Sequence, residues 1–519
     1  MKKILALLLA ALMVVSCAGC SSSSDESGTK ADTATEAAES KVPELKGPGN
    51  VTIVSVNSNV TFDPNEDSSA PRIEEATGYH VEYEMLPAEN ATEKLMLEAT
   101  SGTDWDMVKC NMSQFQKLQA SGALLPLNDL LEAYGPDILA GYDESSWAAV
   151  SDSAGVIYGI PWETSSYNEI KTFIICRWDL MQAAGITEVP ETVQEFYDTC
   201  AQLKDYYGDE YIILTGPQKL ATYDPWLFPR NITSAFGIWN DWMTDEEGNL
   251  HYITEDEGFA DLMNYFQSLY KAGFLDPEWA VNTNETVSEK WTSGKAIMCV
   301  TGRDACNLNT PVLLETCGIT YDDIEYIGML EGEDGTCEFM PFNGVQNVSV
   351  ILRSSDCAAD VINWNNLKVQ NQMYLNFGVE GTHFTRDADG NMEPIQPAFN
   401  ENYANSYWYC NAMAMRDYQK DWPARLRKSD AQWDCWKRVT LKAQNETPEI
   451  YIENPFMYMN AGEAYSSYNA ALTSLLNDYV VQVMSGVRTI DDLPSFVSEW
   501  KAAGGEEVRA ELEAYLSTK

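Results

Sequence analysis

Apolar runs of strand length alternate with amphipathic stretches of helix length along the first part of the folded chain. Residues 51–56 are rich in β-branched side chains and are bounded by Gly49-Asn50 and Asn57-Ser58-Asn59, which indicates a strand. The segments that follow alternate in type, and this rhythm predicts a parallel sheet with helices on both faces. These segments are a helix near 70–77, a strand at 80–85, a helix at 91–101, a strand at 104–111 and a helix at 114–120.

Polar residues follow two of these predicted strands. Asn57 comes directly after the first strand, and Asn111 ends the third. Because ligands of open α/β sheets bind outside the carboxyl ends of the strands, the loops at 57–59 and 111–113 are candidate ligand-facing segments. An ordinary polar loop is the alternative interpretation at both places.

The rest of the chain continues the mixture of short strands and amphipathic helices. Thr192 followed by Glu195 is a capping box, which predicts a helix running to about residue 206. Two Asp-x-x-Gly-Asn turns, at 245–249 and 387–391, predict hairpins. The other predicted strands are 156–163, 169–176, 211–215, 296–300 and 342–352, and the other predicted helices are 259–272, 356–377, 465–485, 493–502 and 506–516.

The first residues have the pattern of an export signal, with Lys2 and Lys3 before an apolar run and small residues after it. The run, residues 4–15, is shorter than the roughly 20 residues of a stable membrane span, so we expect residues 1–19 to be cleaved. Ala18-Gly19-Cys20 resembles a bacterial lipobox, which predicts lipidation of Cys20. Cys17 is the alternative site of lipidation. The alternative to a lipoprotein signal is a free-secretion signal that contains these cysteines. Residues 20–49 have almost no large apolar side chains and are predicted to be a disordered tether.

Composition narrows the class of ligand. The chain has 519 residues, enough for two or three lobes, and is 45% hydrophobic. Its 79 acidic residues against 33 basic ones give a net charge of −46, which disfavours nucleic acid and anionic ligands through long-range repulsion. A neutral ligand is therefore expected.

Metal and thiol chemistry receive little support from the residue pattern. The ten cysteines beyond Cys20 form no CxxC pair and several lie in apolar strand-like runs, so we expect mostly free, buried thiols. The three histidines are not paired with cysteine at zinc-ligand spacing. The 387–391 turn resembles part of a calcium loop, but Gly390 stands at the fourth place and Ala398 at the twelfth, where an EF-hand needs glutamate. A hairpin turn is the preferred interpretation, and neither a metal nor a cofactor is predicted.

The chain also carries a series of motifs that share the order of a known family. Taken together they resemble the extracellular solute-binding proteins that feed ABC importers, specifically the large lipoprotein branch of the sugar-binding family. Each motif is weak alone, and their shared order covers about residues 50–516. They are the lipobox, SGALLPL at 121–127, YGIP at 158–161, RWDL at 177–180, PETVQEF at 190–196, LYKAGFLDP at 269–277, SGKAIM at 293–298, NFGVEGTHF at 376–384 and the segment from IDDL at 490–493 to Trp500.

The resemblance implies an α/β fold of the two-lobed, type II periplasmic-binding-protein kind, with the ligand in a cleft between lobes joined by hinge strands. The apparent crossings lie near 159–161, 342–347 and 452–456. They divide the chain into an N-lobe, 50–158 and 348–450, and a C-lobe, 162–340 and 460–519.

A neutral sugar has apolar faces and hydroxyl edges, so its site combines aromatic platforms with groups that hydrogen-bond in pairs. Trp162 and Glu163 are the first choices, because the family places ligand contacts just after this crossing. Asn111 and Arg303 follow strands of opposite lobes, and Arg303 has a surface salt bridge as its alternative. Trp239 and Trp242 form either a platform or a packed hydrophobic corner. The remaining candidates are Tyr407 and Trp408 on an aromatic rim, and Asn57 and Glu380 as weaker choices.

The leading hypothesis is a lipid-anchored, non-catalytic, monomeric receptor on the outer face of the cell membrane. It would capture a carbohydrate, with an oligosaccharide expected, and pass it to the permease subunits of an ABC importer. A binding protein for a non-sugar solute such as a peptide is the alternative. A secreted glycoside-active enzyme is a further alternative, because the many acidic residues could include a catalytic pair of carboxylates. The chain has no P-loop, HExxH motif or nucleophile elbow.

Overall fold

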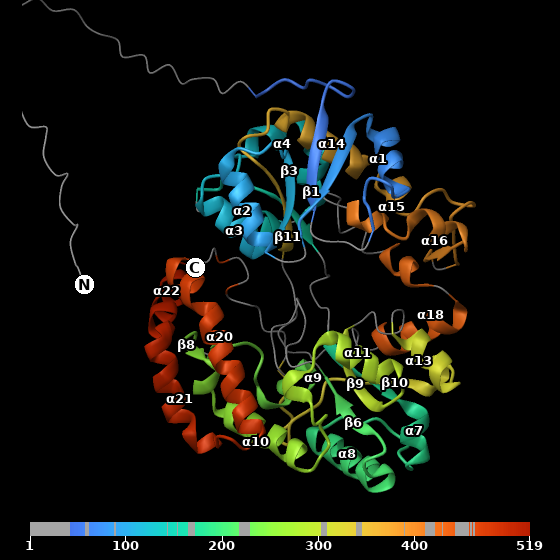
Figure 1. Cartoon of the computed structure of the whole chain (residues 1–519), viewed down its shortest axis with the longest axis vertical. Helices are drawn as coiled ribbons and strands as arrows, with labels where there is room; N and C mark the ends of the chain where they lie inside the picture. The colour runs from blue at the N-terminus through green and yellow to red at the C-terminus, as the bar shows by residue number, and fades with distance from the viewer. Residues whose placement is uncertain are drawn as a thin grey trace, which may run out of the picture. The chain divides into compact units, whose positions relative to one another are not determined.

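Two main sheets organise the folded part of the chain (Figure 1). Each sheet has a hydrophobic core on both of its faces. The chain divides into two units, residues 1–41 and 42–519, and the second is described below. The computed structural model describes residues 42–57, 62–87, 90–142, 144–152, 154–163, 172–216, 229–245, 247–302, 309–338, 345–388, 390–409, 421–427, 429–441, 456, 459 and 462–518.

The first sheet has the strand order β2-β1-β3-β11-β4. Its strands are β1 (Thr52–Asn57), β2 (His80–Met85), β3 (Met107–Asn111), β4 (Ile160–Glu163) and β11 (Val345–Ile351). β1, β2 and β3 run parallel, as the alternation of strand and helix predicts. β11 is antiparallel to both β3 and β4. It enters the sheet at the edge where β3 ends, since Asn347 near its start lies opposite Asn111.

Side-chain alternation along these strands creates two cores, one on each face of the sheet. Met107 of β3 packs into one core, and Val108, the next residue, packs into the other. The helices on the face of Met107 are α1 (Ser69–Thr77), α4 (Asn128–Tyr134), α5 (Pro136–Gly141), α14 (Ala358–Gln370) and α15 (Gln372–Asn376), and those on the face of Val108 are α2 (Ala91–Ser101), α3 (Met112–Ala120) and α6 (Glu144–Ala149). The sequence predicts a single helix at 356–377, but the structure has two, α14 and α15. They are separated at Asn371, whose φ and ψ of −104° and 15° are not helical.

The start of the folded unit is held against this first lobe by one buried carboxylate. Asp360, in the first turn of α14, accepts hydrogen bonds from the backbone N–H of Lys46 (3.0 Å) and of Gly47 (2.8 Å). The Tyr79 hydroxyl donates a third bond to it at 2.9 Å. Residues 46 and 47, expected to belong to a disordered tether, are thus part of the folded body.

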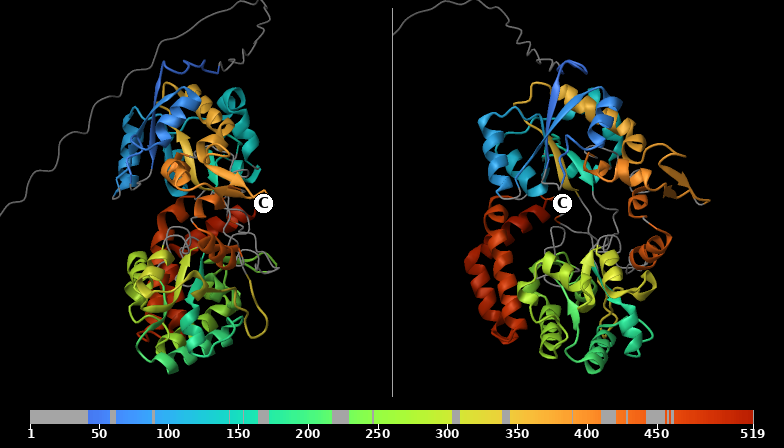
Figure 2. Two further views of the ribbon diagram at one scale, coloured as in Figure 1. Left: turned by 90° about the vertical axis from the view of Figure 1, so that its right-hand side faces the viewer. Right: turned by 45° about the vertical axis from the view of Figure 1, so that its right-hand side comes forward.

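The second sheet has the order β10-β5-β9-β6. Its strands are β5 (Thr172–Arg177), β6 (Ile212–Thr215), β9 (Ala296–Gly302) and β10 (Ile324–Ile327). The core on one face of the sheet includes α7 (Trp178–Ala183), α8 (Val193–Tyr207), α9 (Arg230–Thr233) and α10 (Glu257–Lys271), and it extends beyond α10 to α20 (Glu463–Met484), α21 (Leu493–Trp500) and α22 (Glu506–Leu516). The core on the other face includes α11 (Asn284–Thr292), α13 (Thr310–Cys317) and α18 (Asp430–Trp436). The views of Figure 2 show α20, α21 and α22 as one group of helices beside α10.

Local signals in the sequence are confirmed where the structure describes them. Thr192 and Glu195 form the predicted capping box at the start of α8. Both Asp-x-x-Gly-Asn turns are hairpins, one between β7 (Trp242–Thr244) and β8 (Leu250–Tyr252), the other between β12 (Phe384–Arg386) and β13 (Met392–Pro394). Cys110, Cys176, Cys200, Cys299, Cys317, Cys337, Cys357 and Cys435 are free.

The lobe boundaries differ from the expectation in two places. Ile160 and Pro161, predicted to lie in a crossing, pair with Ser349 and Val348 inside the first sheet. The N-lobe was expected to reach residue 450, whereas Leu426, at the end of η6 (Trp422–Leu426), packs in the core of the second sheet. The physical reason is that α18 and η7 (Lys437–Leu441) bury apolar side chains, Cys435, Trp436 and Val439, against β5 and β10.

Of the predicted crossing at 452–456, only Phe456 is described, and it packs on the second lobe. Within the described residues, no helix is both long and apolar enough to span a membrane.

Candidate functional site

The carboxyl edge of the first sheet brings several of the predicted ligand residues together. Asn57 ends β1, Asn111 ends β3, and Trp162 and Glu163 end β4. Asn347 of β11 lies opposite both Asn111 and Trp162 in the register, which places these strand ends side by side. This confirms the topological reasoning that put Asn57 and Asn111 at one edge. The side chain of Glu163 is outside the described part of the structure.

The two asparagines differ in what their side chains already do. Asn111 is exposed and is the N-cap of α3, where its side-chain oxygen accepts from the Gln114 N–H at 2.9 Å. Gln114 returns a bond by accepting from the Asn111 N–H at 3.0 Å. This capping box satisfies two N–H groups at the start of the helix, so Asn111 has a structural role besides any contact with a ligand. Asn57 is buried.

A buried lysine that sequence reasoning missed lies at the same edge. Lys109 of β3 is 2% exposed, and its Nζ lies 3.1 Å from the ring centroid of Trp162. The same Nζ lies 5.4 Å from the ring centroid of Trp408. Trp162 and Trp408 are both half-buried. The signal that could have revealed Lys109 is its place two residues before Asn111 in a strand, which puts both side chains on one face of the sheet.

Trp408 lies on η5 (Ser406–Tyr409), a short segment held by buried cations. The guanidinium of Arg425 donates to the Ser406 hydroxyl and to the carbonyl oxygens of Tyr403 and Asn376, each at 2.6 Å. Lys368 donates to the Tyr409 carbonyl at 3.3 Å. These bonds hold the segment on both sides of Trp408 in place.

Trp239 and Trp242 lie in the hydrophobic core of the second lobe, which is the packed corner given as the alternative to a ligand platform. They are 5% and 2% exposed. The Trp242 ring packs 5.0 Å from Tyr252 and 5.5 Å from Trp500, centroid to centroid. Trp500 of α21 packs on Trp242 and Tyr252 of the β7–β8 hairpin, so the packed corner is the arrangement found.

The other predicted residues are not gathered at the sheet edge by the described contacts. Glu380 is exposed in the turn before β12, where its backbone forms an isolated β-bridge with that of Phe384. Tyr407 belongs to η5, but its side chain is not described. Arg303, Cys20 and Cys17 lie outside the described residues.

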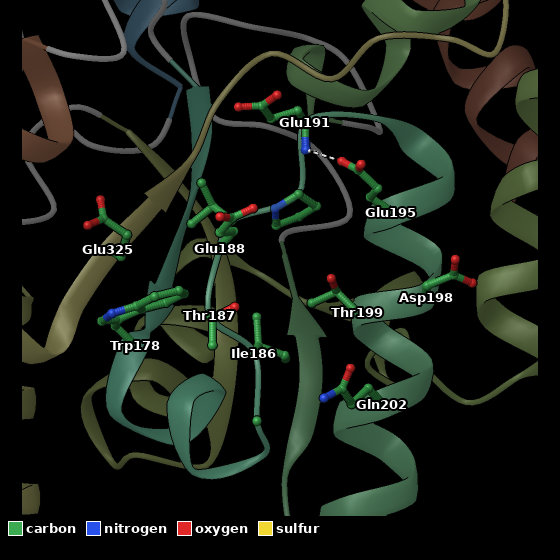
Figure 3. Close-up of a pocket in the computed structure, with 13 residues that line it drawn as sticks. Trp178, Ile186, Thr187, Glu188, Glu191, Glu195, Asp198, Thr199, Gln202 and Glu325 are labelled. Atoms are coloured by element: carbon green, nitrogen blue, oxygen red, sulfur yellow. Dashed lines mark hydrogen bonds between the residues drawn. The ribbon is translucent and has the colours of Figure 1, made fainter.

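An open pocket of about 640 Å³ lies on the second lobe, between α7, α8 and the segment that joins them (Figure 3). Acidic side chains surround it, and one of them is already used locally: the Glu195 carboxylate accepts from the Glu191 N–H at 2.9 Å. None of the residues predicted for the ligand site lines this pocket. Its lining includes Trp178, Ile186, Glu188, Glu191, Glu195, Asp198 and Glu325.

Asp106, Asp356 and Cys357 bring three potential metal-ligand atoms within 4.8 Å of one another. Asp106 is already engaged, because its carboxylate accepts from the Ser355 hydroxyl at 2.6 Å and from the Val54 N–H at 2.9 Å. Asp356 pairs with Lys46 at 3.0 Å. Burial raises the pKa of the Cys357 thiol to about 12, so without a metal this thiol is protonated at neutral pH.

Comparison with solved structures defines the class of fold as that of the two-lobed, type II periplasmic solute-binding proteins. The fructooligosaccharide-binding protein FusA of Streptococcus pneumoniae, solved with fructo-nystose, superposes with a TM-score of 0.66 at 16% identity, covering 90% of this chain and 99% of FusA. A human-milk-oligosaccharide-binding protein of Bifidobacterium longum infantis gives 0.67 at 13% identity, over 91% of this chain and 99% of its own.

The family of bacterial extracellular solute-binding proteins matches residues 70–355. The chain belongs to this family. Lipoprotein LipO of Bacillus subtilis is 24% identical over 545 aligned positions, covering 100% of this chain and 99% of LipO.

Proposed function

We propose that this solute-binding protein captures an oligosaccharide for an ABC importer, without catalysing a reaction, at the carboxyl edge of its first sheet. The observation that carries the proposal is the pair of half-buried rings, Trp162 and Trp408, beside Asn57 and Asn111. An indole face covers the apolar face of a sugar ring, and amide groups hydrogen-bond its hydroxyls. The fold supports this assignment, since similar structures were solved as oligosaccharide-binding proteins.

The charge of the chain supports a neutral glycan. At −46 the net charge repels polyanions over long range. A partner in the membrane that receives the ligand fits the export signal at the N-terminus. We propose that Cys20 carries the lipid, with Cys17 as the alternative, and that the chain works as a monomer on the outer face of the cell membrane. Mass spectrometry of the mature N-terminus distinguishes the two cysteines.

Calorimetry of the body from Lys41 onward against a panel of glycans and peptides tests the ligand class. Saturable heat is expected with at least one neutral oligosaccharide, and Trp162→Ala and Trp408→Ala should weaken it about tenfold or more, as expected for stacked aromatic contacts. Trp178→Ala is the matched control, because this indole is also half-buried but lines the acidic pocket of the second lobe.

The outcomes separate the alternatives. Binding to peptides with no heat from any glycan contradicts a sugar ligand. Loss of binding in Trp178→Ala alone would move the site to the acidic pocket. Recovery of shortened glycan after long incubation would contradict the absence of catalysis.

A further inference from the structure

We propose that Lys109 is a positioning residue that sets the orientation of Trp162 and Trp408 for the ligand. The expected effect on glycan affinity rests on the proposed function, because it concerns how tightly the proposed site binds its ligand. The geometric part of the inference, the coupling of a buried ammonium to two indole rings, is independent of what the ligand is.

The backbone places Lys109 where it reaches both rings. Lys109 lies in β3, flanked by Val108 and Cys110, whose side chains pack in the core on the opposite face. Its own side chain lies on the same face as Met107. Trp162 ends β4, two strands away in the sheet, and Trp408 comes from η5. Lys109 therefore links two segments that are far apart in the sequence.

The ammonium covers one face of the Trp162 ring. At 3.1 Å from the ring centroid, Nζ leaves no room for another group on that face. A cation over an indole is attracted by the negative face of the ring, and the attraction grows when the cation is desolvated, as at 2% exposure. The ring is thus held, and a ligand can stack only on its other face.

Ring exposure distinguishes this contact from a similar one in the same lobe. Lys368 lies 3.9 Å from the ring centroid of Trp364, but Trp364 is 1% exposed in the core and cannot meet a ligand. Trp162 and Trp408 are half-buried. Of these two buried lysines, Lys109 contacts rings that remain partly open to solvent, whereas Lys368 contacts a ring in the core. Fixing such rings in advance reduces the conformational entropy lost on binding.

Ligand affinity tests the functional consequence. Lys109→Met, which removes the charge and keeps a similar chain length, should weaken glycan binding about tenfold, and Lys109→Arg should restore most of it. In a Trp162→Leu background, Lys109→Met should cause a smaller further loss, because the part of its effect that passes through Trp162 is already gone and only the part through Trp408 remains. A merely structural lysine would instead lower the affinity equally in both backgrounds.

Lys94→Met is the matched control. Lys94 lies 5.9 Å from the ring centroid of Trp105 in the same lobe, and Trp105 precedes the opposite end of β3. This variant should leave the glycan affinity unchanged. A loss equal to that of Lys109→Met would overturn the proposal, since any lysine–indole contact in the lobe would then have the same effect.

Urea unfolding without ligand tests the geometric part separately. The urea midpoint of the Lys109→Met/Trp162→Leu double variant should fall by less than the sum of the decreases in the two single variants. If Lys109→Met does not fold, Lys109→Gln takes its place in both experiments. Additive losses overturn the positioning role whatever the ligand is. Non-additive losses in a chain that binds no glycan would instead support the positioning role and contradict the proposed ligand class.

Discussion

At the scale of single residues, one buried carboxylate shows how the fold holds a charge. Asp276 of the second lobe is fully buried and accepts hydrogen bonds from Thr215 (2.6 Å), Lys290 (2.8 Å) and Asn282 (2.9 Å). Burial by itself would raise the pKa of this carboxyl, but these bonds outweigh burial and hold the pKa below its ordinary value. The charged form is thus the one that the fold requires.

This lowered pKa predicts acid sensitivity of the second lobe. The carboxylate contributes stability at neutral pH, and the contribution is lost as the pH falls below about 4 and through the lowered pKa. Asp276→Asn should reduce the free energy of unfolding by about 2–3 kcal/mol at neutral pH, and the difference from wild type should shrink on acidification. Urea unfolding across this pH range measures both.

Asp209→Asn is the control for that experiment. Asp209 also pairs with a lysine, Lys204, at 2.6 Å, but its side chain is 97% exposed, so its loss should leave the free energy of unfolding nearly unchanged. An equal effect of the two substitutions would mean that burial is not what gives Asp276 its importance.

At the scale of elements, the start of α20 depends on a side chain from another helix. The N-cap of α20 is Gly462, which has no side chain to cap the helix. Glu511 of α22 replaces it: its carboxylate accepts from the Ala464 N–H at 2.8 Å and from the Tyr465 N–H at 3.1 Å. The carboxylate also lies where it complements the positive end of the helix dipole.

Glu511→Ala should therefore destabilise the C-terminal helices by about 1 kcal/mol, the usual effect of losing an N-cap. The two N–H groups would lose their acceptor, while the backbone of α22 would be unaffected. Thermal unfolding followed by circular dichroism measures the change. Glu513 on the same helix is exposed, so Glu513→Ala should have a much smaller effect. A similar loss of thermal stability in both variants would show that helix propensity, not capping, is responsible.

At the scale of the whole molecule, the net charge of −46 sets a repulsion that no local contact removes. Raising the salt concentration from about 10 mM to about 150 mM shortens the Debye length from about 30 Å to about 8 Å. The urea midpoint should rise over this range, because the folded chain holds its charges closer together than the unfolded chain. An unchanged or falling midpoint would indicate that attractive surface ion pairs offset the repulsion.

Much of the fold was predictable from local pattern. The parallel β1, β2 and β3, the capping box of Thr192 and Glu195 and the two hairpins follow from side-chain spacing and turn chemistry. The burial of Trp242 was not predictable, because it depends on Trp500, which is distant in the sequence. The packing of Leu426 and Trp436 was not predictable for the same reason, because only the sheet against which they pack assigns them to a core.

The candidate site divides in the same way. The sequence by itself determined the α/β class and the position of Asn57 and Asn111 at strand ends, because these follow from the order of residues and the direction of strands. Only the tertiary structure decided which aromatic rings stay partly open and that Lys109 meets Trp162 and Trp408. Packing brings these three residues together from separate elements, and no local pattern carries that information.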